Sequence, residues 1–347
     1  MSATVSHEPP PAWAVTYEQW QAFVDLLCEE RTVYAPQAQN GATVYRALAP
    51  ADKVAWGQPP STVSPRNVFL PQTETLFRYR SVAGSMRIEP GEAAKPAVLL
   101  GAAPCDLRAI AVLDAVYAAG QPDPYYVARR QQTVIIARAC VSPRPTCFCT
   151  AMGGDPFGSA RSDLFVTDLG DRYLIEALTR AGRALAGRQR WPVVCTAERT
   201  AASRLAAAAR AALPPPDVPP NLCQLPKTLV DSPLWHTVAE RCLGCAVCAY
   251  VCPTCHCFDI VDEPGCQGCG KRVRNWDSCQ FAVYSLEASG HNPRPSSRER
   301  VRNRVLDKLA YVEQKTGLLG CVGCGRCVRA CPVNIDLREI IAEVRHV

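Results

Sequence analysis

Apolar residues near the start of the chain recur at helical spacing. Thr16 and Gln19 carry the capping-box pattern that often begins a helix. The apolar positions behind them fall at i, i+3, i+4 and i+7, namely Trp20, Phe23, Val24 and Leu27. Because this spacing puts all four side chains on one face, we predict an amphipathic helix here, preceded by a flexible lead over residues 1–15.

Later apolar runs change to the pattern of an α/β domain. Residues 33–90 alternate weakly and contain several prolines, which indicates short strands and loops. Four apolar runs then predict strands, at residues 97–101, 133–137, 164–167 and 173–175. The first two runs are continuous, as in strands that are buried on both faces of a sheet. Helices are expected from Asp106 through Tyr117 and, in an alanine- and arginine-rich stretch, over residues 197–212.

The segment LPPPDVPPN at residues 213–221 interrupts this pattern. Its five prolines cannot continue a helix and favour an extended, semi-rigid linker. We therefore predict a domain boundary here, between residues 16–212 and residues 222–347. Beyond the linker, a predicted helix has one apolar face, made of Val301, Val305, Leu309 and Val312. A capping box at Asp336 begins a final helix.

The composition limits the class of protein. With 347 residues, 48% of them hydrophobic and 20% charged, the chain can bury a core. A formal charge of +6 is small for this length and does not demand a nucleic-acid partner. The sequence has no apolar run of about 18 residues, and it begins without the pattern of a secretory signal. We therefore expect a cytoplasmic protein without a membrane span.

Cysteine is the informative residue in this composition. Thirteen of the 20 cysteines lie between Cys242 and Cys331, mostly in CxxC or CxC groups. A reducing cytoplasm keeps such thiols free to bind metal. Metal binding is therefore the predicted role of this part of the chain.

Two runs of cysteines share the order C-x2-C-x2-C-x3-C-P. The first run is Cys242, Cys245, Cys248 and Cys252, and the second is Cys321, Cys324, Cys327 and Cys331. Three thiolates at this spacing wrap a loop around one [4Fe–4S] cubane, and the fourth, followed by proline, reaches across to the other cluster. One predicted cluster is thus bound by Cys242, Cys245, Cys248 and Cys331, and the other by Cys321, Cys324, Cys327 and Cys252. A pair of zinc sites is the alternative, although such sites rarely repeat this order together with proline.

An insertion of 68 residues separates the two runs and holds five more cysteines. These are Cys255, Cys257, Cys266, Cys269 and Cys279. The pair Cys266 and Cys269 has the spacing of a further metal site, with zinc as the candidate metal. The alternative is that the five are buried thiols that pack beside the clusters, and the sequence does not decide between the two. With this insertion, the predicted fold is α+β: an N-terminal α/β domain followed by a mostly helical dicluster ferredoxin-like domain.

A third group of cysteines follows the first two predicted buried strands. Cys105 comes just after residues 97–101, and Cys140, Cys147 and Cys149 come after residues 133–137. Loops that leave the carboxyl ends of adjacent parallel strands meet in one crevice. Four thiols there would be the number that a cubane requires. We predict a third [4Fe–4S] cluster at this place, with ordinary buried cysteines as the alternative.

Several segments together resemble one known family. They are LLGAAPCDLRAIAVLD (99–114), DPYYVARRQQTVIIARAC (123–140), CFCTAMGGDPFG (147–158), DLFVTDLGDRYLIE (163–176), CPTCHCFDI (252–260), WDSC (276–279), GHNPR (290–294) and CVGCGRCVRACPVNIDL (321–337). They are similar to the beta subunits of cytoplasmic sulfhydrogenase-type nickel–iron hydrogenases and to the iron–sulfur A subunits of anaerobic sulfite reductases. Residues 1–97 carry no such resemblance.

The resemblance implies a subunit without substrate chemistry of its own. It would relay electrons between a flavin-containing, NAD(P)H-oxidising partner and a catalytic partner, here expected to be a nickel–iron hydrogenase, with a sulfite reductase as the alternative. The sequence agrees in having neither a GxGxxG nor a GxxxxGK[ST] motif for a nucleotide.

Two other classes of function stay open. An enzyme would use a metal site near Cys255, Cys257 and Cys279. A zinc-containing structural or nucleic-acid-binding protein would use the basic stretch from Arg294 to Arg304. Because the arginines of that stretch alternate with an apolar helical face, we expect them to be solvated or to face a partner.

Overall fold

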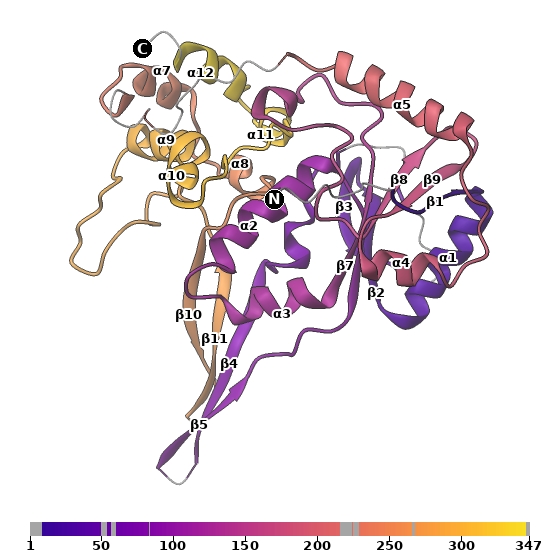
Figure 1. The fold of residues 1–347 in the computed structure, drawn as a ribbon. Helices are drawn as coiled ribbons and strands as arrows, with labels where there is room; N and C mark the ends of the chain where they lie inside the picture. Colours follow the sequence, from indigo (N-terminus) through magenta and orange to yellow (C-terminus); the bar gives the residue numbers. More distant parts are fainter. Residues whose placement is uncertain are drawn as a thin grey trace, which may run out of the picture.

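The computed structural model describes residues 9–49, 54–56, 60–82, 84–215, 224, 229–265 and 268–344. It contains two β-sheets and a set of helices, so the predicted α+β class is confirmed (Figure 1). Within the described residues, no helix has both the length and the apolar character to span a membrane.

The larger sheet has seven strands in the order β1-β9-β8-β7-β6-β2-β3. Their bounds are β1 Ala12–Val15, β2 Thr32–Gln39, β3 Ala42–Ala47, β6 Ala97–Ala102, β7 Thr133–Arg138, β8 Leu164–Asp168 and β9 Tyr173–Ala177. Strands β2, β6, β7 and β8 are parallel neighbours, and the other pairs are antiparallel. All residues of β6 are buried, which is why its sequence is a continuous apolar run.

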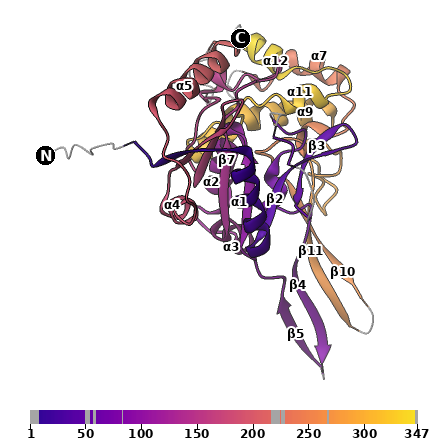
Figure 2. The same cartoon turned by 90° about the vertical axis from the view of Figure 1, so that its right-hand side faces the viewer.

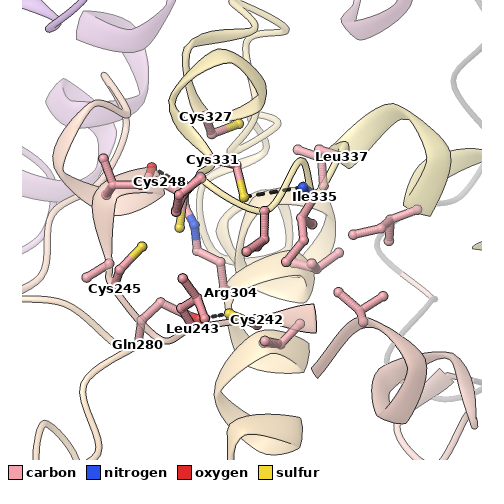
Figure 3. A pocket seen from close by; sticks show the side chains of 18 of the residues that line it. Cys242, Leu243, Cys245, Cys248, Gln280, Arg304, Cys327, Cys331, Ile335 and Leu337 are labelled. Carbon is pink, nitrogen blue, oxygen red and sulfur yellow. Dashed lines mark hydrogen bonds between the residues drawn. The ribbon is translucent and has the colours of Figure 1, made fainter. Parts of the chain in front are cut away.

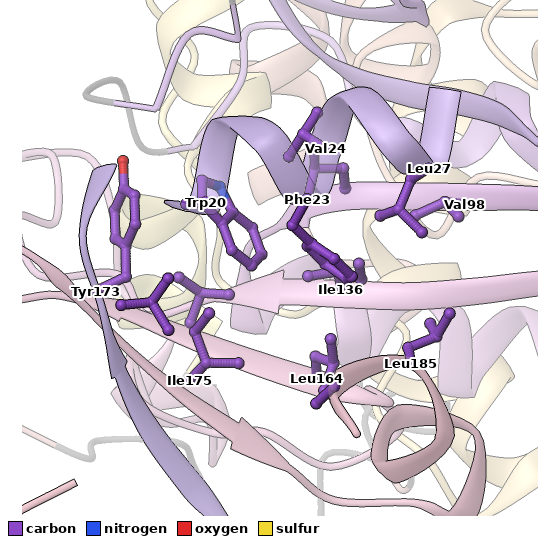
Figure 4. Close-up of a cluster of buried hydrophobic side chains, with 14 of the residues drawn as sticks. Trp20, Phe23, Val24, Leu27, Val98, Ile136, Leu164, Tyr173, Ile175 and Leu185 are labelled. Atoms are coloured by element: carbon purple, nitrogen blue, oxygen red, sulfur yellow. The ribbon is translucent and has the colours of Figure 1, made fainter. Parts of the chain in front are cut away.

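Helices cover both faces of this sheet. Helices α1 (Tyr17–Glu30) and α4 (Arg180–Ala186) pack on one face, where Phe23 and Leu27 meet Val98 (Figure 4). Helices α2 (Pro104–Tyr117) and α3 (Pro124–Gln132) pack on the other, where Leu107 meets Leu99. Since alternate residues of β6 point to opposite faces, one strand supplies both cores. Each fully buried leucine contributes about 1.5–3 kcal/mol.

Several predicted elements of this half are confirmed. Thr16 and Gln19 form the expected capping box of α1, and the expected alanine-rich helix is α5 (Thr196–Ala211). The prediction of a flexible lead was wrong for Ala12–Val15, because these residues form β1 and pair with β9. Residues 216–221 of the proline-rich linker lie outside the described residues, so the domain boundary stays a prediction.

The smaller sheet joins segments that lie far apart in the sequence. Its order is β10-β11-β4-β5, all antiparallel, with β4 at Thr73–Val82, β5 at Ser85–Pro90, β10 at Phe258–Pro264 and β11 at Cys269–Trp276. The four strands project from the body as a narrow arm (Figure 2). We predicted mostly helical structure between the cysteines of the C-terminal half. This prediction was wrong for β10 and β11, which are strands. Strand β11 pairs with β4, a long-range partner that a local pattern does not reveal.

The arm is fixed to the body by buried charge. Arg274 of β11 forms ion pairs with Glu74 of β4 and with Asp123, which caps α3. Both Arg274 and Glu74 are buried, so each charge needs the other. The junction lies beside a short 3₁₀ helix, Pro65–Val68, from the first half of the chain.

The remaining helices lie in the C-terminal part of the chain, and several of them share a separate small core. They are α7 Leu234–Arg241, α8 Val247–Tyr250, α9 Ser297–Leu306, α10 Val312–Thr316, α11 Arg326–Ala330 and α12 Leu337–Val344, with a π-helical turn at Asp307–Tyr311 between α9 and α10. Trp235, Leu306 and Ile341 meet in this core. The predicted apolar face over Val301–Val312 is confirmed, since all four of its residues are buried. A short 3₁₀ helix, Thr150–Met152, also contributes Met152 to this core.

Candidate iron–sulfur centres

The two cysteine motifs have the same local backbone conformation. In each, the second and fourth residues after the first cysteine have positive φ: Gly244 (66°) and Ala246 (61°) in one, Gly323 (65°) and Gly325 (66°) in the other. A short helix follows at once, α8 or α11, and includes the third cysteine. The sequence repeat is therefore a structural repeat.

This conformation turns backbone amides towards the ligand sulfurs. Gly244 donates its N–H to Cys242 Sγ at 3.4 Å, and Gly323 donates to Cys321 Sγ at 3.5 Å. These hydrogen bonds favour the thiolate form, the form that binds metal.

The first motif and the last cysteine of the second share one cavity. Cys242, Cys245 and Cys248 line a cavity of about 90 Å³ together with Cys331 (Figure 3). Ile335 donates its N–H to Cys331 Sγ at 3.2 Å. Burial raises the pKa of Cys242, the Gly244 amide lowers it, and the charges of the other three thiolates raise it again. The four thiols that the sequence assigns to one cluster thus lie close together.

The second set of thiols also crosses between the motifs. Burial, with a smaller contribution from the neighbouring Cys324 and Cys252, raises the pKa of Cys321 to about 12. Cys324 and Cys327 likewise have raised pKa values, mainly through burial, and Cys252 adds to both. Buried thiols this close together are unfavourable as free thiolates. A metal centre would offset that cost, so the donor set fits a cluster.

The strand topology assumed for the third group of cysteines is confirmed. Strands β6 and β7 are parallel neighbours; Cys105 lies in the first turn of α2, and Cys140 follows β7. Burial, with a smaller contribution from the thiolates of Cys147 and Cys149, raises the pKa of Cys140 to about 12. The pKa of Cys105 is raised by burial first, with Cys140 among its charged neighbours. Electrostatic interactions through Cys140 thus link the four thiols near the carboxyl end of the sheet, and their shared cluster stays a prediction.

The third group lies directly against the second motif. Phe148 donates its N–H to the carbonyl of Gly323 at 2.8 Å. A Cβ atom on Gly323 would lie 2.5 Å from Phe148 O, and one on Gly325 would lie 2.3 Å from Thr146 O. Two reasons therefore favour glycine at both positions. The backbone has a positive φ, and the loop over residues 146–149 leaves no room for a Cβ atom.

A buried ion pair joins the same two groups. Arg326, between Cys324 and Cys327, contacts Asp106 at 2.8 Å, and their side chains are 0% and 1% exposed. Asp106 follows Cys105 and also accepts the N–H of Ala103. Arg326 donates further to Ser61 O at 2.9 Å. Sequence reasoning missed this pair, because its members lie far apart in the chain.

Two cations lie between the two ferredoxin-type motifs. Arg304 Nη2 donates to Cys248 O at 2.8 Å, and Lys308 Nζ donates to Thr254 O at 3.2 Å. Lys308 is buried beside Asp307, with 2.9 Å between Nζ and Oδ2. Burial lowers the pKa of Arg304, but the thiolates around it, Cys255, Cys252, Cys248 and Cys327, outweigh that effect.

The expectation that the arginines of this stretch face solvent or a partner was wrong for Arg304. It lines the cavity of the first motif together with Val301 and Val305. The positions 301, 304, 305 and 308 form one helical stripe, so the spacing carried the signal.

The cysteines of the insertion do not act as one group. Cys255 shares a hydrogen bond with Cys252, and Cys257 shares one with Cys279. Cys269 is exposed on β11, and Cys266 lies outside the described residues. No three His, Cys, Asp or Glu side chains of the described ranges are arranged to hold a single metal ion. The ligands of a cubane lie farther apart, because each binds a different iron.

Comparisons with known proteins agree with this geometry. The family described as "4Fe-4S dicluster domain" matches residues 241–335. Sulfhydrogenase 2 subunit beta of Pyrococcus furiosus is 29% identical over 334 residues, covering 94% of this chain and 96% of the relative. Ferredoxin-3 of Rhodobacter capsulatus is 30% identical over 74 residues, which is 21% of this chain and 70% of the relative. No solved structure matches this chain.

The paired motifs and the dicluster match define a ferredoxin-type iron–sulfur electron-transfer subunit. Along almost the whole chain the protein is similar to the beta subunit of a sulfhydrogenase, which agrees with the family resemblance of its sequence.

Proposed function

We propose that this chain relays electrons through three [4Fe–4S] clusters. The first is bound by Cys242, Cys245, Cys248 and Cys331, the second by Cys321, Cys324, Cys327 and Cys252, and the third by Cys105, Cys140, Cys147 and Cys149. A bound [4Fe–4S] cluster accepts and donates one electron at a time, at a potential set by hydrogen bonds, charge and burial.

One observation carries this proposal: the three thiol groups form a continuous row. The second set touches the third group through Phe148 and Gly323, and it approaches the first set around Arg304. Short steps between neighbouring groups suit electron transfer better than isolated sites would. The second set is thus the middle of the relay.

The residues of the chain prepare each group for a cluster. Backbone N–H donors face the sulfurs of Cys242, Cys321 and Cys331, which stabilises negative charge on them. Apolar side chains around the first cavity, among them Val305 and Ile340, keep water away.

The first cluster is proposed as the exchange point with a partner. Cys245 is exposed, and Leu243 beside it is 68% exposed. A partner that covers this apolar spot would bring its own redox group close to the first cluster. Electrons would enter or leave the chain there.

The partners follow from the relative that covers almost the whole chain, which is named as the beta subunit of a sulfhydrogenase. We propose a flavin- and NAD(P)-binding reductase subunit on one side and a nickel–iron hydrogenase subunit on the other, in a cytoplasmic complex with neither nucleic acid nor membrane. The chain itself would have no catalytic site. A sulfite reductase as the catalytic partner is the second candidate, from the resemblance alone.

Metal analysis of the anaerobically purified complex tests this proposal. Twelve iron atoms per chain, a matching amount of acid-labile sulfide and a brown colour are expected for three cubanes. The polypeptides that purify with the chain identify the catalytic partner. A colourless protein that contains zinc would overturn the proposal.

Variants test the relay itself. Cys245→Ser and Cys324→Ser should each remove one cluster signal from the electron paramagnetic resonance spectrum and stop electron flow between the partners. Cys195→Ser, at an exposed cysteine of the first half, is the matched control and should change neither. Full activity of the complex after both ligand changes would refute an electron-relay role.

A further inference from the structure

Two cysteines outside the three cluster groups meet at the base of the arm. Cys257 directly precedes β10, and Cys279 follows β11. The hairpin register pairs Phe258 with Trp276, and Asp277 donates its N–H to the carbonyl of Cys257 at 3.1 Å. The strand pairing therefore places Cys279 two residues beyond Asp277, the residue that bonds to the Cys257 backbone.

The side chains of this pair contact each other and a tyrosine. The Cys257 and Cys279 thiols share a hydrogen bond, and Tyr284 O–H and the Cys279 N–H also donate to the Cys257 sulfur. Three donors thus converge on one sulfur, as around a nucleophilic thiolate. The surroundings of the two cysteines differ, since Cys279 is buried whereas Cys257 is partly exposed.

The two thiols also differ in acidity, in the sense that suits an attacking and a resolving cysteine. The hydrogen bond from Cys279 lowers the pKa of Cys257, and the same bond, followed by burial, raises the pKa of Cys279. The Cys257 sulfur is therefore the more nucleophilic one, and the Cys279 sulfur keeps its proton until its partner has reacted.

We propose that Cys257 and Cys279 form a redox-active dithiol that undergoes thiol–disulfide exchange with a small disulfide. The Cys257 thiolate attacks one sulfur of the disulfide, whose S–S bond breaks and releases one thiolate. Cys279 then loses its proton and attacks Cys257 in the mixed disulfide, which releases the second thiolate. The two cysteines are oxidised to a disulfide, and the small disulfide is reduced to two thiols.

The third cysteine nearby has a different environment. Cys255 is buried, and its thiol receives a hydrogen bond from Arg304 at 2.7 Å and shares another with Cys252. It is thus engaged with the second cluster group and not with Cys257. This arrangement favours a two-cysteine exchange site over a three-cysteine metal site.

The site would make the base of the arm sensitive to the thiol–disulfide balance. The arm is attached to the body here through Trp276, whose indole N–H donates to Leu70 O at 2.9 Å. A covalent bond between Cys257 and Cys279 would tie the two ends of the β10–β11 hairpin together. The proposal does not depend on the clusters, since neither cysteine belongs to a cluster group.

Exchange with oxidised glutathione tests the proposal on the full-length, anaerobically purified protein. After quenching with iodoacetamide, tandem mass spectrometry should find a Cys257–Cys279 disulfide that dithiothreitol removes. Cys279→Ser should lose that disulfide and instead retain a glutathione adduct on Cys257. Cys195→Ser should behave like the unchanged protein.

Iron content, measured on the same samples, separates this proposal from the cluster assignments. Cys257→Ser and Cys279→Ser should keep the full iron content of the unchanged protein. Loss of iron or zinc from either variant would overturn the dithiol and make the two residues metal ligands. Absence of the disulfide, under conditions in which the exposed Cys195 becomes glutathionylated, would overturn it as well.

Discussion

Arg304 donates a hydrogen bond from Nη1 to the Sγ of Cys255 at 2.7 Å. Through its other terminal nitrogen it also contacts the first cysteine motif, at Cys248 O. Since the Cys327 thiolate also acts on this guanidinium, it lies between the two ferredoxin-type motifs. Its positive charge stabilises the electron-rich form of any group that gains an electron nearby.

Removing this charge should lower the potentials of both neighbouring clusters. One charge about 8–16 Å from a cluster is worth on the order of 1–2 kcal/mol at an effective dielectric constant near 20, or about 40–90 mV for one electron. Arg304→Gln is therefore expected to shift the midpoint potentials of these two clusters down by about that amount, as followed in a redox titration by electron paramagnetic resonance.

Arg300→Gln is the matched control for that change. Arg300 lies on the same helix, but its side chain donates to Pro295 O at 2.7 Å, away from the thiols. Its substitution should leave the potentials where they are. Equal shifts in both variants would mean that the helix, and not the guanidinium, sets the effect.

The chain should not tolerate the loss of one member of the Asp106–Arg326 pair. Removing one member of a fully buried pair leaves the other charge without compensation, at a cost of about 3–5 kcal/mol. Arg326→Met should lower the free energy of unfolding by that amount in a denaturant titration. Arg80→Met breaks an exposed pair with Glu89 on the arm, and it should leave the unfolding midpoint almost unchanged. A small effect of Arg326→Met would show that solvent reaches Asp106.

Gly325 and Ala246 occupy equivalent positions in the two motifs. Adding a methyl group at Gly325 should be harmful, whereas removing the one at Ala246 should not. Gly325→Ala places a Cβ 2.3 Å from Thr146 O, so the loop over residues 146–149 must move. We expect loss of iron from the third group and a loss of stability beyond the roughly 1–2 kcal/mol that a left-handed alanine costs. Ala246→Gly, at the same place in the first motif, removes a methyl group and should keep all iron. Iron analysis with thermal unfolding distinguishes the two outcomes.

Acid should destabilise the chain through His256. Burial is the main cause that lowers the pKa of this imidazole from its usual 6.5, and Lys308 adds to the effect. Between the ordinary and the lowered pKa, the unfolded chain binds a proton that the folded chain does not, so stability rises with pH there. The contribution is complete above pH 6.5 and is lost as the pH falls towards the lowered pKa. Unfolding titrations should show that His256→Gln flattens this slope, whereas the exposed His291 can be replaced without effect.

Local patterns in the sequence determined much of this protein. The spacing of the eight motif cysteines predicted both loops and the grouping of their thiols, because three ligands of each set lie within a few residues. The apolar periodicity likewise predicted α1, with its cap at Thr16, and the buried strands β6 and β7. In each case the determining interaction lies within a turn of helix or along one strand.

Only the tertiary structure decided what brings distant segments together. Strand β11 pairs with β4, Arg326 finds Asp106, and Arg304 turns towards thiols from both motifs. Cys257 and Cys279 become neighbours because a hairpin closes between them. These contacts form only when elements far apart in the sequence pack together. Local patterns therefore do not reveal the partner of a buried charge or thiol. The sequence predicted the candidate ligands, and the fold places their groups next to one another.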